Sequence, residues 1–383
     1  METTVTSPTT PSSPDTTHAV GQPPSSPDET PSAHVARARS AEIEAQIALD
    51  PSRYRVLTGD RPTGALHLGH LLATLESRVR LQDAGVDVVV VVADYQVVAD
   101  RDEAGDLPAV VREVVLDHLA AGIDPDRSTM FTHSAVSALH QLMLPFLSLV
   151  TVAELERNPT VRAEAVAAAA RQERSMSGLL LTYPVHQAAD ILAVHGNLVP
   201  VGTDQLPHLE TTRTVARRFN QRYTAAQPYF AEPEALLTAS TTVLGHDGTK
   251  MSKSRGNALE LRATEDDTVA FFRRARTDSI RHVTFEPQER PEVANLLRIG
   301  AHFAGTTPQA LAESVGAAGA GPLKAVVTEA VVEGLRPLRE RRRALADDAG
   351  AVVREVLARG NARATALAEG TLTDVRELMR TVY

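Results

Sequence analysis

The apolar run VDVVVVVA at residues 86–93 constrains the fold of this chain more than any other stretch. It is far too short to span a membrane, and it lacks the alternation of a strand that has one face in water. A near-continuous apolar strand of this kind is typical of a parallel sheet that helices cover on both faces. We expect this strand to run on through residue 100.

Strands and helices alternate around this run. Residues 54–59 and 128–134 have the composition of further strands, and residues 71–85 and 107–123 have the spacing of amphipathic helices. The alternation predicts an α/β fold with a Rossmann-like, doubly wound parallel sheet. We expect a helical insertion at about residues 138–180, and an all-helical C-terminal domain whose last segment is a pair of helices.

The chain divides into three predicted parts. Residues 1–45 form a Ser/Thr/Pro-rich tail, in which seven of the 23 prolines fall between Pro8 and Pro31, and we expect it to be disordered. The tail has neither the basic start nor the apolar centre of a signal peptide. Residues 46–262 form the predicted catalytic α/β domain, and residues 263–383 form the predicted helical region.

The composition excludes several kinds of site. The chain has no cysteine, so disulfides, thiolate zinc sites and cysteine nucleophiles are ruled out, and a cytoplasmic protein is the simplest expectation. The formal net charge of −9 argues against a generally basic nucleic-acid binder, although a local basic face would suffice for an RNA partner. No membrane partner is expected.

The stretch TGDRPTGALHLGH, residues 58–70, falls where the first strand gives way to the first helix. Glycines there let a ligand approach the backbone, and a helix N-terminus favours anionic groups. His67 and His70 are three residues apart, so they share one side of the helix and can donate to the same phosphate. Gly69 leaves room for a flat ring. The alternatives are a metal-binding pair, or histidines that only begin a helix.

A second stretch, KMSKS at residues 250–254, follows the last predicted strand. Lys250 and Lys253 can follow a pyrophosphate group as it separates, and the small side chains of Ser252 and Ser254 allow backbone contacts. The stretch is not a P-loop, because no G-x-x-x-x-G-K-[ST] occurs. Alone it fits a solvated loop equally well, but together with the histidine stretch it indicates an ATP site.

The two stretches resemble the two signatures of class I aminoacyl-tRNA synthetases. HLGH is similar to the His-x-Gly-His signature, KMSKS is identical to the lysine signature, and the resemblance covers about residues 53–383. Four runs resemble the tryptophanyl-tRNA synthetases in particular: TGDRPTGALHLGH at 58–70, LVPVGTDQLPHLETTRTVARRFN at 198–220, RARTDS at 274–279 and PLRERRRALADD at 337–348.

The resemblance implies a role for individual residues. Catalysis would depend on His67, His70, Lys250 and Lys253. The ATP-binding residues would be Arg61, Pro62, Thr63, Gly69, His70, Gly202, Thr203, Asp204, Lys250, Met251, Ser252, Lys253 and Ser254. Asp190 would accept the indole N–H of tryptophan, and the rest of the amino-acid pocket would be Tyr183, Gln187 and Gln205. ATP is then a substrate, Mg²⁺ binds its phosphates, and no metal held by the protein is implied.

The spacing of the pocket residues agrees with this assignment in part. Tyr183, Gln187 and Asp190 recur at i, i+4 and i+7, which places them on one face of a helix. A buried carboxylate needs a partner, and an indole N–H would supply one. The alternative is a hydrogen-bonded network inside the core.

Three positions depart from the commoner tryptophanyl pattern. Gln187 stands where many bacterial enzymes have methionine, and Arg61 and His70 stand where glutamine and asparagine are common. The Tyr-x-x-x-Gln-x-x-Asp pattern is also similar to the tyrosine pocket of the sister family, the tyrosyl-tRNA synthetases. The chain therefore resembles a divergent, auxiliary-type subgroup of the tryptophanyl family.

The resemblance implies a homodimeric tryptophan–tRNA ligase, which forms tryptophanyl-adenylate from ATP and transfers the amino acid to tRNA(Trp). Its arginine-rich segments at residues 272–282 and 336–348 would contact tRNA phosphates, or else form a solvated basic face. Three alternatives stay open: tyrosine as the substrate, a non-catalytic paralogue that senses tryptophan or ATP, and a nucleotidylyltransferase that acts on small molecules.

Overall fold

The computed structural model describes residues 31–100, 105–170, 176–202, 206–224, 226–238 and 242–383. Its centre is a parallel sheet of five strands in the order β3-β2-β1-β4-β5. The strands are Arg55–Asp60 (β1), Asp87–Val92 (β2), Thr129–Thr132 (β3), Leu198–Val201 (β4) and Glu234–Leu237 (β5). The strand order reverses beside β1, and ligand crevices form at the carboxyl ends of strands at such a reversal.

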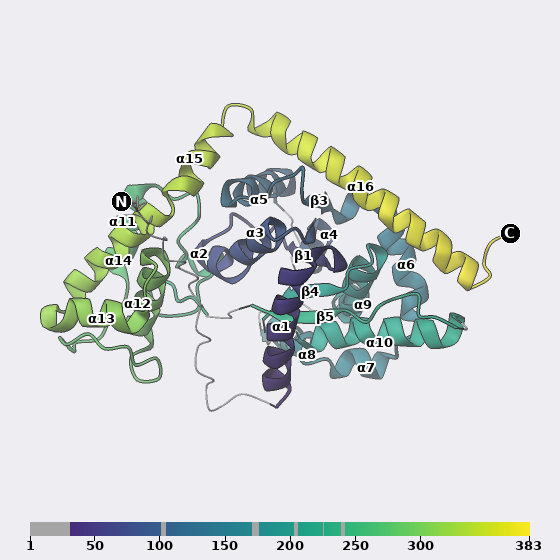
Figure 1. The fold of residues 1–383 in the computed structure, drawn as a ribbon, viewed down its shortest axis with the longest axis horizontal. Helices are drawn as coiled ribbons and strands as arrows, with labels where there is room; N and C mark the ends of the chain where they lie inside the picture. The colour runs from purple at the N-terminus through teal and green to yellow at the C-terminus, as the bar shows by residue number, and fades with distance from the viewer. Residues whose placement is uncertain (1–30, 101–104, 171–175, 203–205, 225, 239–241) are drawn as a thin grey trace, which may run out of the picture.

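Helices cover both faces of this sheet, as the sequence predicts (Figure 1). In chain order, the helices before β4 are α1 (Pro31–Leu49), α2 (Leu68–His70), α3 (Glu76–Asp83), α4 (Asp94–Asp100), α5 (Leu107–Ala121), α6 (Ser137–Leu147), α7 (Val152–Arg157), α8 (Pro159–Ala170) and α9 (Gly178–Ala193). After β4 they are α10 (Leu206–Tyr223), α11 (Glu265–Arg274), α12 (Pro291–Ala304), α13 (Pro308–Val315), α14 (Ala320–Gly334), α15 (Arg336–Ala344) and α16 (Ala349–Leu378).

Alternate residues of β2 enter the two apolar cores. Val88, Val90 and Val92 pack with residues of α1, α3 and α5 on one face of the sheet. Val89 and Val91 pack with residues of α6, α9 and α10 on the other face. Both sets are buried, so the uninterrupted valine run follows from a strand that meets no water on either side.

The strand predicted to run through residue 100 is shorter than expected. It ends at Val92, and α4 begins at Asp94, whose carboxylate accepts hydrogen bonds from the backbone N–H and the hydroxyl of Ser134. Val97 then enters the core from a helix instead of a strand. An apolar run by itself does not mark where a buried strand turns into a buried helix.

The segment predicted as a disordered tail is helical in its last part. Helix α1 begins at Pro31, and Ile43 and Ile47, one turn apart, are buried beneath the sheet. The hydroxyl of Ser40 accepts a hydrogen bond from the backbone N–H of Leu237 at 2.9 Å, so this helix covers the edge strand β5. The rest of the predicted tail, residues 1–30, lies outside the described residues.

The last helix is a single element of 30 residues, so the expected pair of helices is wrong. It passes the edge strand β3, where a Cβ atom at Gly360 would lie 1.8 Å from the carbonyl oxygen of Met130. The side chain of Asn361 accepts a hydrogen bond from the backbone N–H of Thr132 at 3.0 Å. Gly360 therefore permits a close helix–strand contact, and it does not end a helix.

The remaining helices form two groups. Helices α6, α7 and α8 occupy the predicted insertion, and α11 to α15 surround an apolar cluster of their own beside α2. Helix α16 leaves that group and returns along the sheet (Figure 1). None of the described helices is long and apolar enough to cross a membrane.

Candidate active site

The histidine loop, residues 61–70, connects β1 to α2 and α3. His67 precedes α2, and its Nδ1 accepts a hydrogen bond from the backbone N–H of Gly69 at 3.1 Å. The Nδ1 of His70 accepts from the backbone N–H of His67, also at 3.1 Å. Because each Nδ1 acts as an acceptor, the proton of each neutral ring is on Nε2. Both rings therefore keep an Nε2–H donor for a ligand.

The two rings are close together and uncharged near neutral pH. Their centroids are 3.8 Å apart, as expected for histidines on one side of a helix. Burial, together with the charges of the neighbouring His70 and Lys253, lowers the pKa of His67 to about 3. Burial lowers the pKa of His70 to about 4, although Asp60 opposes this shift. These side chains can donate hydrogen bonds, but the positive charge at this site has to come from elsewhere.

The lysine loop, residues 250–256, supplies that charge. The fully buried side chain of Asn257 holds this loop: its Oδ1 accepts from the backbone N–H of Ser252 at 2.8 Å. Its Nδ2 donates to the carbonyl oxygen of Lys250 at 3.2 Å and to the carboxylate of Asp247 at 2.8 Å. One side chain thus fixes the loop backbone on both sides of Met251.

The two loops meet in the folded chain. Two backbone hydrogen bonds join residues 66–68 to residues 259–261: from Leu68 N to the oxygen of Leu259 at 2.8 Å, and from Leu261 N to the oxygen of Leu66 at 2.9 Å. Gly64 has a φ of +145°, and a Cβ atom on it would lie 3.0 Å from Cδ of Lys253 and 3.4 Å from its Nζ. These contacts place the Lys253 side chain beside the histidine loop.

Gly69 lies against a histidine side chain of its own loop. The sequence predicts that it makes room for a flat ring of the ligand. In the structure, a Cβ atom on Gly69 would lie 3.0 Å from the imidazole of His67, so the ring beside this glycine is that of the protein. The side chain of Met251 is buried in the apolar cluster beside α2. Any contact of Met251 with ATP would therefore be made by its backbone.

A cavity of about 290 Å³ lies at the carboxyl ends of β1, β2 and β4. Tyr183, Gln187 and Asp190 all line it, so their predicted helix face points into a ligand-sized space. Arg61 of the histidine loop and Gly202 also line it. The predicted residues Thr203, Asp204 and Gln205 lie outside the described residues. Pro62 is buried, and Thr63 closes a tight turn through its N–H and the oxygen of Arg61 at 2.8 Å.

The amino-acid end of the cavity contains polar groups in fixed positions. The Tyr183 hydroxyl lies 2.9 Å from Nε2 of His208, and the guanidinium carbon of Arg61 lies 5.6 Å from the centre of the tyrosine ring. Asp190 is buried, and its Oδ2 accepts from Nε2 of His133 at 2.9 Å. Its Oδ1 has no hydrogen-bond partner among the described residues. Despite the cost of burial, His133 lowers the pKa of Asp190, which therefore remains a carboxylate.

Several residues that shape the site were missed by the sequence analysis. Asn257, His133 and His208 fall outside the two signatures, and their partners are distant in sequence. Arg78, the largest fully buried side chain, bonds the Thr58 hydroxyl at 3.0 Å and the Asp60 carboxylate at the end of β1. Such pairings between distant segments leave no local pattern in a single sequence.

The use of lysine in this chain is a further signal for the lysine loop. The chain has 39 basic residues, of which only Lys250, Lys253 and Lys324 are lysines. Lys250 and Lys253 are three positions apart in the lysine loop. Lysine carries a compact charge on a flexible side chain, whereas arginine presents a planar guanidinium group. Because the chain uses arginine almost everywhere else, two lysines in one loop indicate that this loop needs compact, movable charges.

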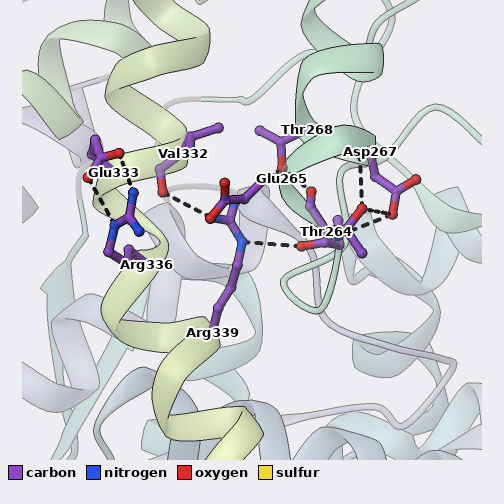
Figure 2. A network of polar contacts seen from close by, with 9 residues as sticks. Thr264, Glu265, Asp267, Thr268, Val332, Glu333, Arg336 and Arg339 are labelled. Atoms are coloured by element: carbon purple, nitrogen blue, oxygen red, sulfur yellow. Dashed lines mark hydrogen bonds and ion pairs between the residues drawn. The ribbon is translucent and has the colours of Figure 1, made fainter.

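The arginine-rich helix α15 is largely tied to the protein itself. Arg339 donates to the oxygen of Val332 at 2.9 Å and to the hydroxyl of Thr268 at 3.2 Å, which joins α15 to α11. Figure 2 shows Arg339 between these two helices. Arg342 pairs with Glu113 and Asp117 of α5. A larger cavity, of about 700 Å³, lies between these helices and away from the two loops. Part of the basic face predicted from the sequence is therefore structural.

The cavity and the loop contacts together define a class of protein. An α/β sheet with a ligand cavity at its strand reversal, whose loop after β1 brings two histidine donors close to Lys253, fits an enzyme that binds a nucleotide triphosphate beside a small polar molecule. No residue of the loops is placed as a covalent nucleophile, so positioning and charge stabilisation are the chemistry available.

Comparison with known proteins identifies the family. Residues 50–336 match the family described as class I tRNA synthetases (W and Y). The chain is 39% identical over 349 residues to a tryptophan–tRNA ligase of Treponema pallidum, covering 85% of this chain and 96% of that one. It is 37% identical over 341 residues to a tryptophan–tRNA ligase of Clostridium longisporum, covering 86% of this chain and 97% of the other.

Solved structures agree with the sequence relatives. The fold matches the tryptophanyl-tRNA synthetase of Mycoplasma pneumoniae with a TM-score of 0.72 at 26% identity, covering 85% of this chain and 97% of that one. The chain therefore belongs to the class I tRNA synthetases for tryptophan and tyrosine, and it is an aminoacyl-tRNA synthetase that uses ATP.

Proposed function

We propose that this chain is a tryptophan–tRNA ligase and that its histidine and lysine loops hold one ATP between them. The observation that carries this proposal is the contact of the Lys253 side chain with Gly64 of the histidine loop, next to two imidazole donors. A phosphate chain that enters this place meets neutral N–H donors and ammonium groups together.

The first step joins tryptophan to AMP. A carboxylate oxygen of tryptophan attacks the α-phosphorus of ATP, the bond from that phosphorus to the bridging oxygen breaks, and pyrophosphate leaves with the electron pair. The Nε2–H groups of His67 and His70 donate to the phosphate oxygens. Lys250 and Lys253 stabilise the charge that gathers on pyrophosphate. Mg²⁺ enters as part of the substrate, bound to the phosphates of ATP.

The remaining ATP contacts follow the chain around the crevice. In the histidine loop, Arg61 and Thr63 would lie near the phosphates, and Pro62 and Gly69 would also contact ATP. Gly202 and Asp204 would bind the ribose, and Thr203 would be a further ATP contact. The backbone of Met251 and the hydroxyls of Ser252 and Ser254, which lie 2.9 Å apart, complete the lysine loop. Small side chains in this loop let the backbone approach the phosphates.

Tryptophan occupies the cavity beside β1 and α9. The unpartnered Oδ1 of Asp190 accepts the indole N–H, which removes the cost of a buried acceptor without a donor. Tyr183, Gln187 and Gln205 bind the polar groups of the amino acid. A phenol hydroxyl could also donate to Asp190, so tyrosine is the second candidate, but the relatives with 37–39% identity are tryptophan–tRNA ligases.

The second step transfers the amino acid to RNA. A terminal ribose hydroxyl of tRNA(Trp) attacks the acyl carbon of tryptophanyl-adenylate, and AMP leaves. We propose that the helices between residues 263 and 383 bind the tRNA. The exposed arginines available for its phosphates include Arg273, Arg274 and Arg281 of the first arginine-rich segment. We further propose that the enzyme acts in the cytoplasm as a homodimer.

Amino-acid-dependent exchange of pyrophosphate into ATP tests this function. We expect tryptophan to drive exchange at least about tenfold faster than tyrosine, because the smaller phenol ring would leave part of a pocket shaped for indole unfilled. Exchange driven best by tyrosine would make the tyrosine candidate correct. If tryptophan binds but neither amino acid drives exchange, the non-catalytic paralogue would be favoured.

A further inference from the structure

A cluster of three histidines and one aspartate lies behind the amino-acid cavity. His133 follows β3, His140 lies on α6, and His186 and Asp190 lie one turn apart on α9. All except the half-buried His140 are buried. The reaction proposed above uses one oxygen of Asp190 and none of the three imidazoles.

The donor atoms of His133, His186 and Asp190 are spaced like the ligands of one metal ion, and His140 approaches this group beside His186. One ligand atom each from His133, His186 and Asp190 lies within 4.8 Å of the others. The separations are 2.9 Å from His133 Nε2 to Asp190 Oδ2, 3.1 Å from His140 Nδ1 to His186 Nε2, and 4.0 Å from His186 Nε2 to Asp190 Oδ1. Ligands about 2.0–2.1 Å from a tetrahedral zinc ion are roughly 3.3 Å apart.

The orientation of the three rings agrees with this spacing. The ring centroid of His186 lies 4.6 Å from that of His133 and 5.1 Å from that of His140. The centroids of His133 and His140 are 6.5 Å apart. Three imidazoles bound to one tetrahedral zinc ion have centroids roughly 5 Å apart. Two of the three centroid separations are close to this value, and the His133–His140 separation is larger.

A hydrogen bond from Nε2 of His140 leaves the Nδ1 of that ring with a lone pair that can bind a metal ion. Its Nε2 lies 3.2 Å from the backbone oxygen of His133, to which it donates, so the proton of the neutral ring is on Nε2. The Nδ1 of the same ring then faces His186 as an acceptor. A metal-bound histidine commonly donates its other ring N–H to a backbone carbonyl in this way.

The cluster is also incomplete as a hydrogen-bonded network. Asp190 Oδ1 and His133 Nδ1 are buried and have no hydrogen-bond partner among the described residues. An unsatisfied carboxylate oxygen inside a protein is costly, and a cation beside it would remove that cost.

We propose that His133, His140, His186 and Asp190 bind one divalent transition-metal ion of the zinc type. Three imidazoles and a carboxylate, with no thiolate, are a common ligand set for zinc, and cobalt and nickel also accept it. Asp190 lines the amino-acid cavity, which gives the ion a route to the site.

Metal and tryptophan compete at this site, an inference that rests on the proposed role of Asp190 in the tryptophan pocket. An ion that takes the carboxylate removes the acceptor for the indole N–H. Zinc therefore weakens tryptophan binding, and tryptophan weakens zinc binding by the same factor.

Titration of the untagged full chain with Co²⁺ tests the metal site directly. We expect visible absorption bands of tetrahedral cobalt that saturate at one ion per chain and that disappear when Zn²⁺ is added. His140→Gln and His186→Gln should each weaken binding about 100-fold, whereas His302→Gln, which changes an exposed histidine paired with Glu76, should not. Absent bands, or identical bands in His140→Gln and His186→Gln, would overturn the proposal.

Tryptophan fluorescence tests the competition, because the chain itself contains no tryptophan. Zinc should raise the Kd of tryptophan at least tenfold for the unchanged chain and should not change it for the His140→Gln variant. We choose His140 for this test because it is half-buried, so its replacement should disturb folding less than replacement of the buried His186. Zinc binding without a change in that Kd would refute the competition. If tryptophan fails to bind even without metal, the proposed function fails, while the cobalt titration still decides the metal site.

Discussion

Replacement of Lys253 by alanine should slow adenylate formation far more than it weakens tryptophan binding. The Lys253 side chain lies against Gly64 and does not line the amino-acid cavity. An ammonium group about 4 Å from a phosphate oxygen contributes on the order of 4 kcal/mol at an effective dielectric constant of 20. Removal of one such stabilising group commonly costs about 10²- to 10³-fold in rate.

The assay is pyrophosphate exchange into ATP with saturating tryptophan, beside a fluorescence titration with tryptophan as the only indole present. We expect Lys253→Ala to lower exchange about 100- to 1,000-fold and to leave the Kd of tryptophan within about twofold. Lys324→Ala is the matched control, since Lys324 is the remaining lysine and contacts the oxygen of Arg273 on the protein surface. Exchange that changes less than about threefold, or that falls equally in both variants, would refute the reasoning.

Three further predictions follow from the same contacts. Asp190→Asn should raise the Kd of tryptophan about tenfold by fluorescence, because a neutral acceptor forms a weaker hydrogen bond than a carboxylate; an unchanged Kd would place the indole elsewhere. Asn257→Ala should destabilise the chain by about 2–4 kcal/mol in urea and lower exchange, because the buried amide bonds several groups of the lysine loop; a stable, fully active variant would contradict this. With pKa values of about 3 and 4 in the folded state against about 6.5 when unfolded, His67 and His70 bind fewer protons folded than unfolded, so their contribution to stability is lost as the pH falls below about 6.5. His70→Gln should make the urea midpoint less dependent on pH between 6.5 and 4, and an unchanged dependence would refute the assigned shift.

The sequence was sufficient for the parts of the fold that have a local cause. The valine run at residues 86–93 predicts a strand buried on both faces, and β2 is such a strand. The i, i+4, i+7 spacing of Tyr183, Gln187 and Asp190 predicts a shared helix face, and all three line one cavity. Each of these features depends on periodicity within one element, which a single sequence displays.

The features that escaped prediction depend on contacts between distant segments. The helical start of α1 is stabilised by burial of Ile43 and Ile47 under a sheet formed later in the chain. The unbroken course of α16 past Gly360 reflects the close approach of β3, more than 200 residues earlier. The polar partners of the site, such as Asn257 and His133, also become visible only when the chain is folded.

The central claim is that the histidine and lysine loops bind the same nucleotide. A crystal structure with a non-hydrolysable ATP analogue and tryptophan tests this claim directly. We expect an imidazole Nε2 of His67 or His70 and the Nζ of Lys253 each to lie within about 3.2 Å of phosphate oxygens of one bound molecule. A nucleotide that occupies the crevice but contacts only one of the two loops, or that binds elsewhere on the chain, would contradict the account.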